Sequence, residues 1–321
     1  MDMINNWYDC FMEALFERFP KRLQLSQALI DLLCIEREAV YRRLRRDVTF
    51  PVNEIVKIAL EWNISLDDLI GINTGQVSFQ MQPVNYLNPS PDELDYLRYI
   101  IRSINNLRNY PSTELMVISN KLPRQLLSGY KNLNKFYLFK WIYQYGHEKE
   151  VVPFSKIEVS GEKQQVDNEY NLAIKQIPDS SFIWDSRIFE YLISNIQYFN
   201  SIRMITDQEK DMIKEELIEM LDYLLKVAGN GCYPETQNKV NLYVSQLSVD
   251  TNYSYTFSPE AKICFIHVFE KCEIYTYNAE MAKNFKKWMQ LKKRSSIQIS
   301  EVDVRSRIDF FSKQQQLIDS L

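Results

Sequence analysis

The sequence predicts a multi-domain chain, in which an all-α N-terminal domain of five helices precedes an α+β domain with a small antiparallel sheet. Apolar residues recur with a helical period and almost no glycine over residues 3–71, which indicates the helical domain. The period changes from 3.6 to 2 over residues 239–277, which indicates strands. Between these parts lies a stretch rich in Gly, Asn, Gln, Ser and Pro. We therefore expect domains at residues 1–75 and 91–321, joined by a linker at 76–90.

Length and composition limit the class of protein. With 321 residues, 45% of them hydrophobic, the chain is long enough to bury substantial cores. The five cysteines are odd in number, far apart and never in a CxxC pair, so we expect neither a disulfide framework nor a metal site, and a reducing cytoplasm as the location. No apolar run approaches the roughly 20 residues that span a bilayer, and the N-terminus lacks a signal-peptide pattern. We expect no membrane partner.

Two helices joined by a tight turn are expected between residues 26 and 46. Ser26 is predicted to cap the first helix, which carries the apolar residues Leu29, Ile30 and Leu33. The turn is Cys34-Ile35-Glu36, and the second helix runs from Arg37 to Arg46. Val40 and Leu44, four residues apart, would face the core from this second helix. The residues left on its outward face are Arg37, Glu38, Tyr41, Arg42 and Arg45.

The charge pattern makes this second helix a candidate interface. The net charge of −4 excludes a protein that coats nucleic acid over its whole surface, so any contact with DNA requires a local basic patch. The segment Arg37–Arg46 holds the densest cluster of arginines in the chain, with a single glutamate among them. Helix pairs of this kind read DNA by laying polar side chains of the second helix on base edges in the major groove. The alternative is a solvated surface, with Glu36, Glu38 and Asp47 as ion-pair partners of the arginines.

The residues that follow carry a resemblance to a known family. A proline-containing loop at residues 47–51 leads to a helix over 52–62 and then to Asn-Ile-Ser-Leu-Asp-Asp-Leu-Ile-Gly over 63–71. With Trp7, Phe11, Leu15 and Phe19 as a first helix, this pattern resembles the Xre-like family of helix-turn-helix regulators, the Cro and phage-repressor type. The resemblance covers residues 7–71 only. Cys34 and Ile30 depart from it, because the family often has glycine and alanine there, and Cys34 would need a conformation that glycine favours.

The resemblance implies a bacterial transcriptional regulator that binds double-stranded DNA, without metal or cofactor, as a homodimer on a near-palindromic site. Carried over by position, the residues expected to face bases are Arg37, Glu38, Tyr41, Arg42 and Arg45, and those expected to touch phosphate are Gln27, Arg46 and Thr49. The rival hypothesis is a protein-interaction module, in which the helical domain docks a partner and the arginines face an acidic surface.

Two capping boxes mark helix starts in the second domain. A capping box at Ser90-Pro91-Asp92-Glu93 starts one helix, and a second at Thr206 and Glu209 starts a long one that ends at Gly229-Asn-Gly231. Between them we expect a short strand at 115–118 and a helix over 124–145. Residues 148–168 turn polar and charged, which predicts a surface loop that includes at most one strand.

The last part of the chain is predicted to hold the sheet. Alternating apolar residues predict an antiparallel meander whose four strands centre on residues 240–244, 253–257, 263–267 and 274–275. An amphipathic helix over 281–289 and a helix over 304–321 follow. The aromatic residues of the meander fit a ligand pocket and the core of a small sheet equally well.

No pattern in the sequence indicates catalysis. The two histidines, His147 and His267, lie far from any nucleophile signature, and glycine-rich phosphate loops and metal-ligand spacings are absent. We expect no enzyme, and a second domain that senses a small molecule, a protein effector or an oligomeric state. An enzyme in residues 90–321 would require a deep pocket with convergent polar groups.

Overall fold

The computed structural model describes residues 2–19, 21–62, 64–66, 69, 77–81, 91–146, 151–259, 261–268 and 272–321. The chain divides into two compact units, Met1–Ser78 and Phe79–Leu321, and each is described here by itself. None of the helices in these described ranges is both long and apolar enough to cross a bilayer.

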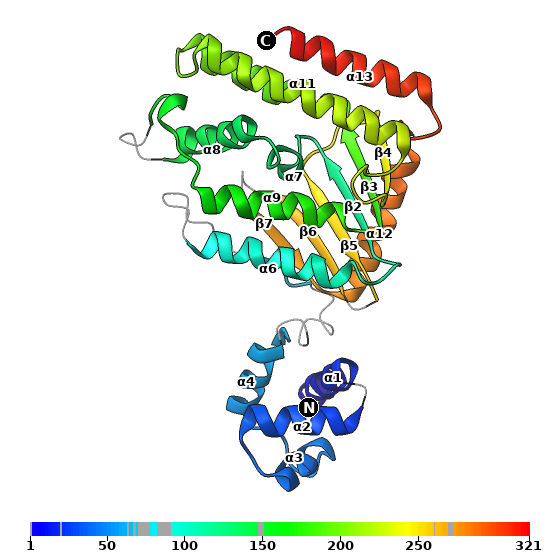
Figure 1. Ribbon diagram of the computed structural model, residues 1–321. Helices are drawn as coiled ribbons and strands as arrows, with labels where there is room; N and C mark the ends of the chain where they lie inside the picture. Colours follow the sequence, from blue (N-terminus) through cyan, green and yellow to red (C-terminus); the bar gives the residue numbers. More distant parts are fainter. Residues whose placement is uncertain are drawn as a thin grey trace. The chain divides into compact units, whose positions relative to one another are not determined.

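The first unit is built from helices packed on one apolar core (Figure 1). Its described helices are α1 (Asp2–Arg18), α2 (Arg22–Leu33), α3 (Arg37–Leu44) and α4 (Val52–Trp62). Each helix contributes its apolar face, as the period of 3.6 predicts, and the buried residues include Phe11, Leu15, Leu25, Leu29, Val40, Leu44, Ile58 and Trp62. The segment 63–71, where the resemblance implies a fifth helix, falls mostly outside the described residues.

Two boundaries of the helix pair differ between the sequence-based prediction and the structure. The prediction that Ser26 caps the first helix is wrong, because α2 begins one turn earlier, at Arg22. Ser26 is buried within α2, and its hydroxyl donates a hydrogen bond to the carbonyl of Leu23, three residues back (3.0 Å). A helix-interior hydroxyl is satisfied in this way without a capping role. The second helix ends at Leu44 rather than Arg46, because Arg46 adopts a left-handed backbone conformation with φ 66°.

The second unit contains a mixed sheet of eight strands in the order β1-β7-β6-β5-β2-β3-β4-β8 (Figure 1). The central strands β2, β3 and β4 pair in parallel, and the other neighbours pair antiparallel. The strands are β1 (Gln80–Met81), β2 (Glu114–Ser119), β3 (Asp179–Asp185), β4 (Lys239–Ser245), β5 (Tyr253–Phe257), β6 (Lys262–Val268), β7 (Cys272–Thr276) and β8 (Ser296–Gln298).

The expected α+β class is right, whereas the expected small antiparallel sheet is wrong. Strands β5, β6 and β7 do form an antiparallel meander. The first predicted strand of that meander, β4, instead pairs in parallel with β3. Parallel neighbours are joined by long crossovers, so their pairing leaves no signal in the local period. Residues 80–81, which we assigned to the linker, pair with β7 at the edge of the sheet.

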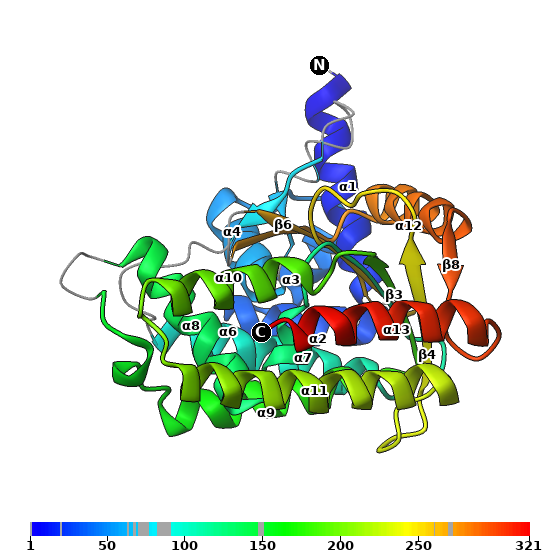
Figure 2. The ribbon, with the colours of Figure 1, turned by 90° about the horizontal axis from the view of Figure 1, so that it is seen from above.

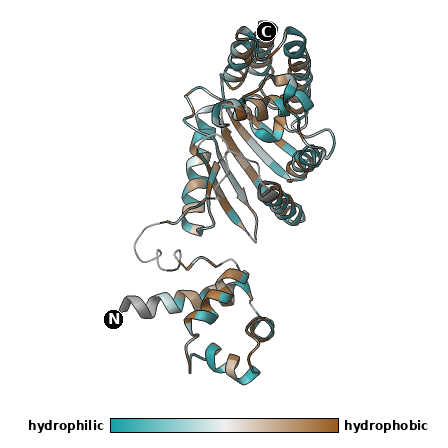
Figure 3. Cartoon of the chain, turned by 90° about the vertical axis from the view of Figure 1, so that its left-hand side faces the viewer, coloured by the Kyte–Doolittle hydropathy of each residue, from teal (hydrophilic) through white to brown (hydrophobic). Residues whose placement is uncertain are grey.

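Helices cover the two faces of the sheet unequally. One face carries α6 (Pro91–Leu107), α7 (Arg124–Leu127), α8 (Lys131–Tyr145), α9 (Gly161–Lys175), α10 (Glu190–Ser201), α11 (Asp207–Asn230) and α13 (Val304–Asp319). The other face carries α12 (Ala279–Arg294). Figure 2 shows α11 and α13 side by side, and Figure 3 shows hydrophobic residues gathered along the sheet and on helix faces turned toward it. Side chains alternate along β2, so that Val117 joins the core under the helix layer and Ile118 the core under α12.

Local signals located most of these helices correctly. The start of α6 at Pro91 is confirmed, and α11 begins behind Thr206 with both hydrogen bonds of the predicted capping box. It ends at Gly231, whose φ of 67° is a left-handed conformation that glycine adopts without strain. The predicted helix over 124–145 is two helices, α7 and α8. The predicted loop at 148–168 is wrong, because it contains the first half of α9, whose N-cap is the Ser160 side chain.

Candidate nucleic-acid interface

Helices α2 and α3 and the turn between them form the expected helix pair. Residues 34–36 connect α2 to α3, as the sequence predicts. Leu29 of α2 and Val40 of α3 are both completely buried in the shared core, and Ile35 packs against it from the turn. A short turn between two helices that bury facing apolar residues fixes the angle between them. The outer surface of α3 is thereby held in one orientation within the unit.

The turn depends on a left-handed residue. Cys34 closes α2 with φ 55° and ψ 41°, and its N–H donates to the carbonyl of Ile30 (2.9 Å). This is the conformation that glycine adopts most readily, so the cysteine reproduces the backbone expected for a glycine at this position. A β-carbon in this conformation costs about 1–2 kcal/mol. The cost is compensated by the packing on both sides of the turn.

Replacing Cys34 with glycine is therefore expected to stabilise the first unit slightly. Relief of the left-handed strain exceeds the extra entropy of glycine in the unfolded chain, which is about 0.4–1 kcal/mol, so the net gain lies between about 0 and 1.6 kcal/mol. Hydrogen exchange of the amides of residues 21–62, recorded on the full chain at increasing denaturant concentration, measures this change in the free energy of unfolding. The matched control is Cys34→Ser, which keeps the β-carbon. A glycine variant less stable than the serine variant would contradict the strain argument.

The outward face of α3 carries the residues expected to meet bases. Arg37, Glu38, Arg42 and Arg45 are exposed and Tyr41 is half-buried, while Val40 and Leu44 on the opposite face are buried. The side chain of Arg42 is exposed and makes no hydrogen bond or ion pair with the described residues. It is thus a long, fully charged side chain on the exposed side of a short helix, which is the arrangement that contacts guanine edges in a major groove.

The other outward residues are linked to one another. Arg37 donates a hydrogen bond to the Tyr41 hydroxyl (3.1 Å), with its guanidinium carbon 5.4 Å from the ring centroid. This hydrogen bond is the largest cause of a lowered pKa of the Tyr41 phenol. Arg45 pairs with Glu38 (3.1 Å) and Asp47 (3.0 Å), whose hydrogen bonds raise its pKa. Exposed pairs of this kind contribute at most about 1 kcal/mol, so they can exchange for a phosphate or a base.

One arginine of the cluster has a structural role that the sequence did not reveal. Arg43 donates to both carboxylate oxygens of Glu54 on α4 (2.6 and 2.8 Å) and to the carbonyl of Ala39 (3.1 Å). The two side chains are only 15% and 13% exposed. Arg43 therefore joins α3 to α4, and the cluster is divided between an outward face and this internal contact. In the sequence, this role is indicated only by the position of Arg43, three residues after Val40 and next to Leu44, which both face the core.

The three residues expected to touch phosphate lie on the surface, and two of them contact a neighbouring side chain. Gln27 is exposed and donates to Asp31 one turn later (3.0 Å). Arg46 forms an ion pair with Asp9 of α1, and Thr49 is exposed. Arg22, which no sequence pattern singles out, donates to the last carbonyl of α3 at Leu44 (3.3 Å). It thereby satisfies one of the helix-end acceptors that would otherwise face water.

Comparison with known protein families, with curated proteins and with solved structures finds no match for this chain. The assignment of a function therefore rests on the geometry of α2, its turn and α3.

Proposed function

We propose that the first unit binds double-stranded DNA sequence-specifically, with α3 in the major groove, and that the chain regulates transcription. The observation that carries the proposal is the division of α3 into two faces. Val40, Leu44 and the Arg43–Glu54 pair anchor one face in the unit. Arg37 and Arg42 are exposed on the other face, and Arg45 is exposed at the end of the helix. A rigidly held helix with projecting guanidinium groups meets the requirement for reading base edges.

Salt titration on duplex DNA tests this function. The affinity of the full chain is expected to fall steeply with ionic strength, with a log–log slope of about −0.9 for each phosphate neutralised. Arg46→Ala is expected to weaken binding to selected and random duplexes alike and to reduce the slope by about 1, because Arg46 is assigned to the backbone. Fluorescence anisotropy with duplexes selected from a random pool supplies both measurements. No duplex affinity at low salt would refute the proposal.

A protein-interaction module is the second candidate, and one observation favours it. Helix α4 exposes an apolar stripe at four-residue spacing, in which Val52 is 75%, Val56 41% and Leu60 78% exposed. Exposed apolar stripes of this kind mark protein–protein contacts. The same stripe serves the proposed regulator as a surface for the expected homodimer. The two candidates separate in one experiment, because a module that only docks proteins has no salt-dependent affinity for DNA.

A further inference from the structure

The second unit contains a cavity of about 620 Å³ between the sheet and the helices that cover it. Strands β2, β5, β6 and β7 form its floor, and helices α6, α8, α9 and α10 contribute to its walls. Its volume lies in the range of small-molecule sites, about 300–1,000 Å³. An enzyme in this part of the chain would require such a pocket, and so would a ligand sensor.

The cavity lies where the sheet changes its pairing. Strand β2 pairs in parallel with β3 on one side and antiparallel with β5 on the other. Ligands of α/β proteins bind at the carboxyl ends of parallel strands, at the point where the strand order changes direction. The carboxyl end of β2 is Ser119, which lines the cavity together with residues 121–124, up to the start of α7.

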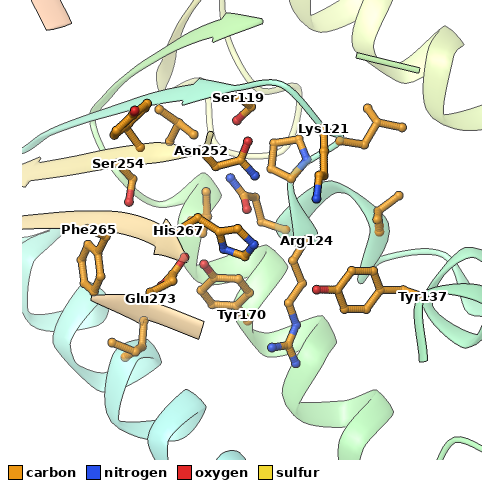
Figure 4. A pocket seen from close by; sticks show the side chains of 18 of the residues that line it. Ser119, Lys121, Arg124, Tyr137, Tyr170, Asn252, Ser254, Phe265, His267 and Glu273 are labelled. Atoms are coloured by element: carbon orange, nitrogen blue, oxygen red, sulfur yellow. The ribbon is translucent and has the colours of Figure 1, made fainter. Parts of the chain in front are cut away.

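Polar side chains from distant parts of the sequence converge here (Figure 4). His267 and Glu273 are directly opposite each other on β6 and β7, so both point from the same face of the sheet. Figure 4 shows the Lys121 amine and the His267 ring turned toward the same central space, with the Tyr170 hydroxyl below them beside Glu273. The positive charges of the lining are Lys121, Arg124 and Lys140, and its described acidic residue is Glu273.

Arg124 is fixed in place at the cavity wall. Its guanidinium donates to Asp167 (3.0 Å), a completely buried carboxylate that also accepts a hydrogen bond from Asn134 (2.9 Å) and forms an ion pair with Lys163. Burial by itself would raise the pKa of Asp167, but the charges of Arg124 and Lys163 together with hydrogen bonds lower it overall. The ionised Asp167 holds Arg124 in one position, which is a form of preorganisation for a ligand.

Two further polar groups point to a ligand. Ser119 is completely buried, and its hydroxyl has no hydrogen-bond partner among the described residues. A buried polar atom without a partner is costly, and Ser119 lines the cavity, so a bound molecule can satisfy it. The side-chain oxygen of Asn252 accepts a hydrogen bond from the backbone N–H of Asn120 (3.0 Å), which fixes the amide orientation and makes its NH₂ group the donor available to the cavity.

The rest of the cavity is apolar, with Leu97, Ile104, Leu115, Val117, Phe136 and Phe265 among its lining residues. We propose that this cavity binds a small organic anion with an apolar body, whose anionic group lies between Lys121 and His267, while Arg124 adds positive charge at the cavity wall. Desolvation in the cavity raises the pKa of Glu273, against the charge of Arg124. Burial also raises the pKa of Tyr170, which keeps this phenol a hydrogen-bond donor.

The proposal is independent of DNA binding, and a matched pair of dyes tests it on the full chain. Anilinonaphthalene sulfonate combines an aromatic body with an anionic group, and N-phenylnaphthylamine is the same ring system without the sulfonate. Fluorescence titration at neutral pH is expected to show one saturable site for the sulfonate dye. Ser254→Phe, which places a ring in the cavity from β5, is expected to abolish the binding of both dyes.

Two charge variants are expected to change the affinity in opposite directions. Lys121→Met is expected to weaken binding of the sulfonate dye about tenfold, because a charge-assisted contact is lost. Glu273→Gln is expected to strengthen it about threefold, because a like charge is removed. The neutral dye is expected to respond to neither. The matched control is Lys287→Met, an exposed lysine of α12 on the opposite face of the sheet, which is expected to bind both dyes as the unaltered chain does.

The outcomes are distinguishable from misfolding. Partly folded proteins also bind anilinonaphthalene sulfonate through exposed apolar surface, so thermal unfolding checks the fold of each variant. A partly folded variant would bind both dyes more tightly, whereas Glu273→Gln is expected to strengthen binding of the anionic dye alone. The opposite effects of Lys121→Met and Glu273→Gln on that dye therefore carry the test even if Ser254→Phe fails to fold. Equal affinity of both charge variants and the Lys287→Met control would overturn the assignment of an anionic ligand. The absence of a saturable site in the unaltered chain, or full binding by a folded Ser254→Phe variant, would overturn the cavity as the site.

Discussion

Replacing Arg42 with alanine is expected to reduce affinity for a selected duplex by about 1–3 kcal/mol, or roughly 5- to 150-fold, and to relax base preference at one position. The expected reason is the loss of a bidentate contact from the exposed face of α3 to a guanine edge. Folding stability is expected to stay unchanged, because Arg42 is exposed and pairs with no described residue. Anisotropy titrations on the selected duplex and on its single-base variants measure both effects.

The matched control for Arg42 is Arg305→Ala. Arg305 is an exposed arginine of α13 in the second unit, so its replacement changes the net charge of the chain equally. This control is expected to keep the affinity and the base preference of the unaltered chain. Equal binding by the Arg42 and Arg305 variants would count against α3 as the helix that reads DNA.

Replacing the neighbouring Arg43 with alanine is expected to destabilise the first unit by about 1–3 kcal/mol. This change leaves the largely buried Glu54 carboxylate without its bidentate partner and removes the hydrogen bond to the Ala39 carbonyl. Hydrogen exchange by mass spectrometry on the full chain measures the effect. Amides of residues 21–62 that exchange through unfolding of the unit are expected to exchange about 5- to 150-fold faster, with β3 unaffected.

A double-mutant cycle with Glu54→Ala separates the pair from other effects of the Arg43 change. The combined variant is expected to be more stable than the sum of the single effects predicts, because neither charge is then left unpaired. Arg43→Lys is expected to fall between the alanine variant and the unaltered chain, since lysine keeps the charge but lacks the planar fork. Strict additivity of the two alanine changes would show that the ion pair does not join α3 to α4.

The two adjacent arginines thus separate recognition from folding. Arg42 is expected to change affinity with stability intact, and Arg43 is expected to change stability first and affinity as a consequence. The direction of each side chain decides this difference, because positions 42 and 43 are about 100° apart around a helix. A binding surface defined by sequence composition alone would treat both residues alike.

Much of the local structure was predictable because its signals are short-range. The Thr206–Glu209 capping box and Gly231 mark the two ends of α11, and residues 34–36 mark the turn between α2 and α3. In each case the side chain and the backbone group it satisfies lie within about one turn, so the pattern contains the interaction. Ser26 shows the limit, because the same residue type that caps helices is here satisfied inside one.

What the sequence determined by itself is therefore the local structure: the helix ends, the turn after α2, the apolar faces and the position of the arginine cluster. Only the tertiary structure decided that Arg43 contacts Glu54, that β4 pairs in parallel with β3, and that Lys121, Tyr170, His267 and Glu273 face one cavity. These relations join residues far apart along the chain. They depend on how the elements pack and on which strands become neighbours, and neither is encoded in the period or spacing of any single segment.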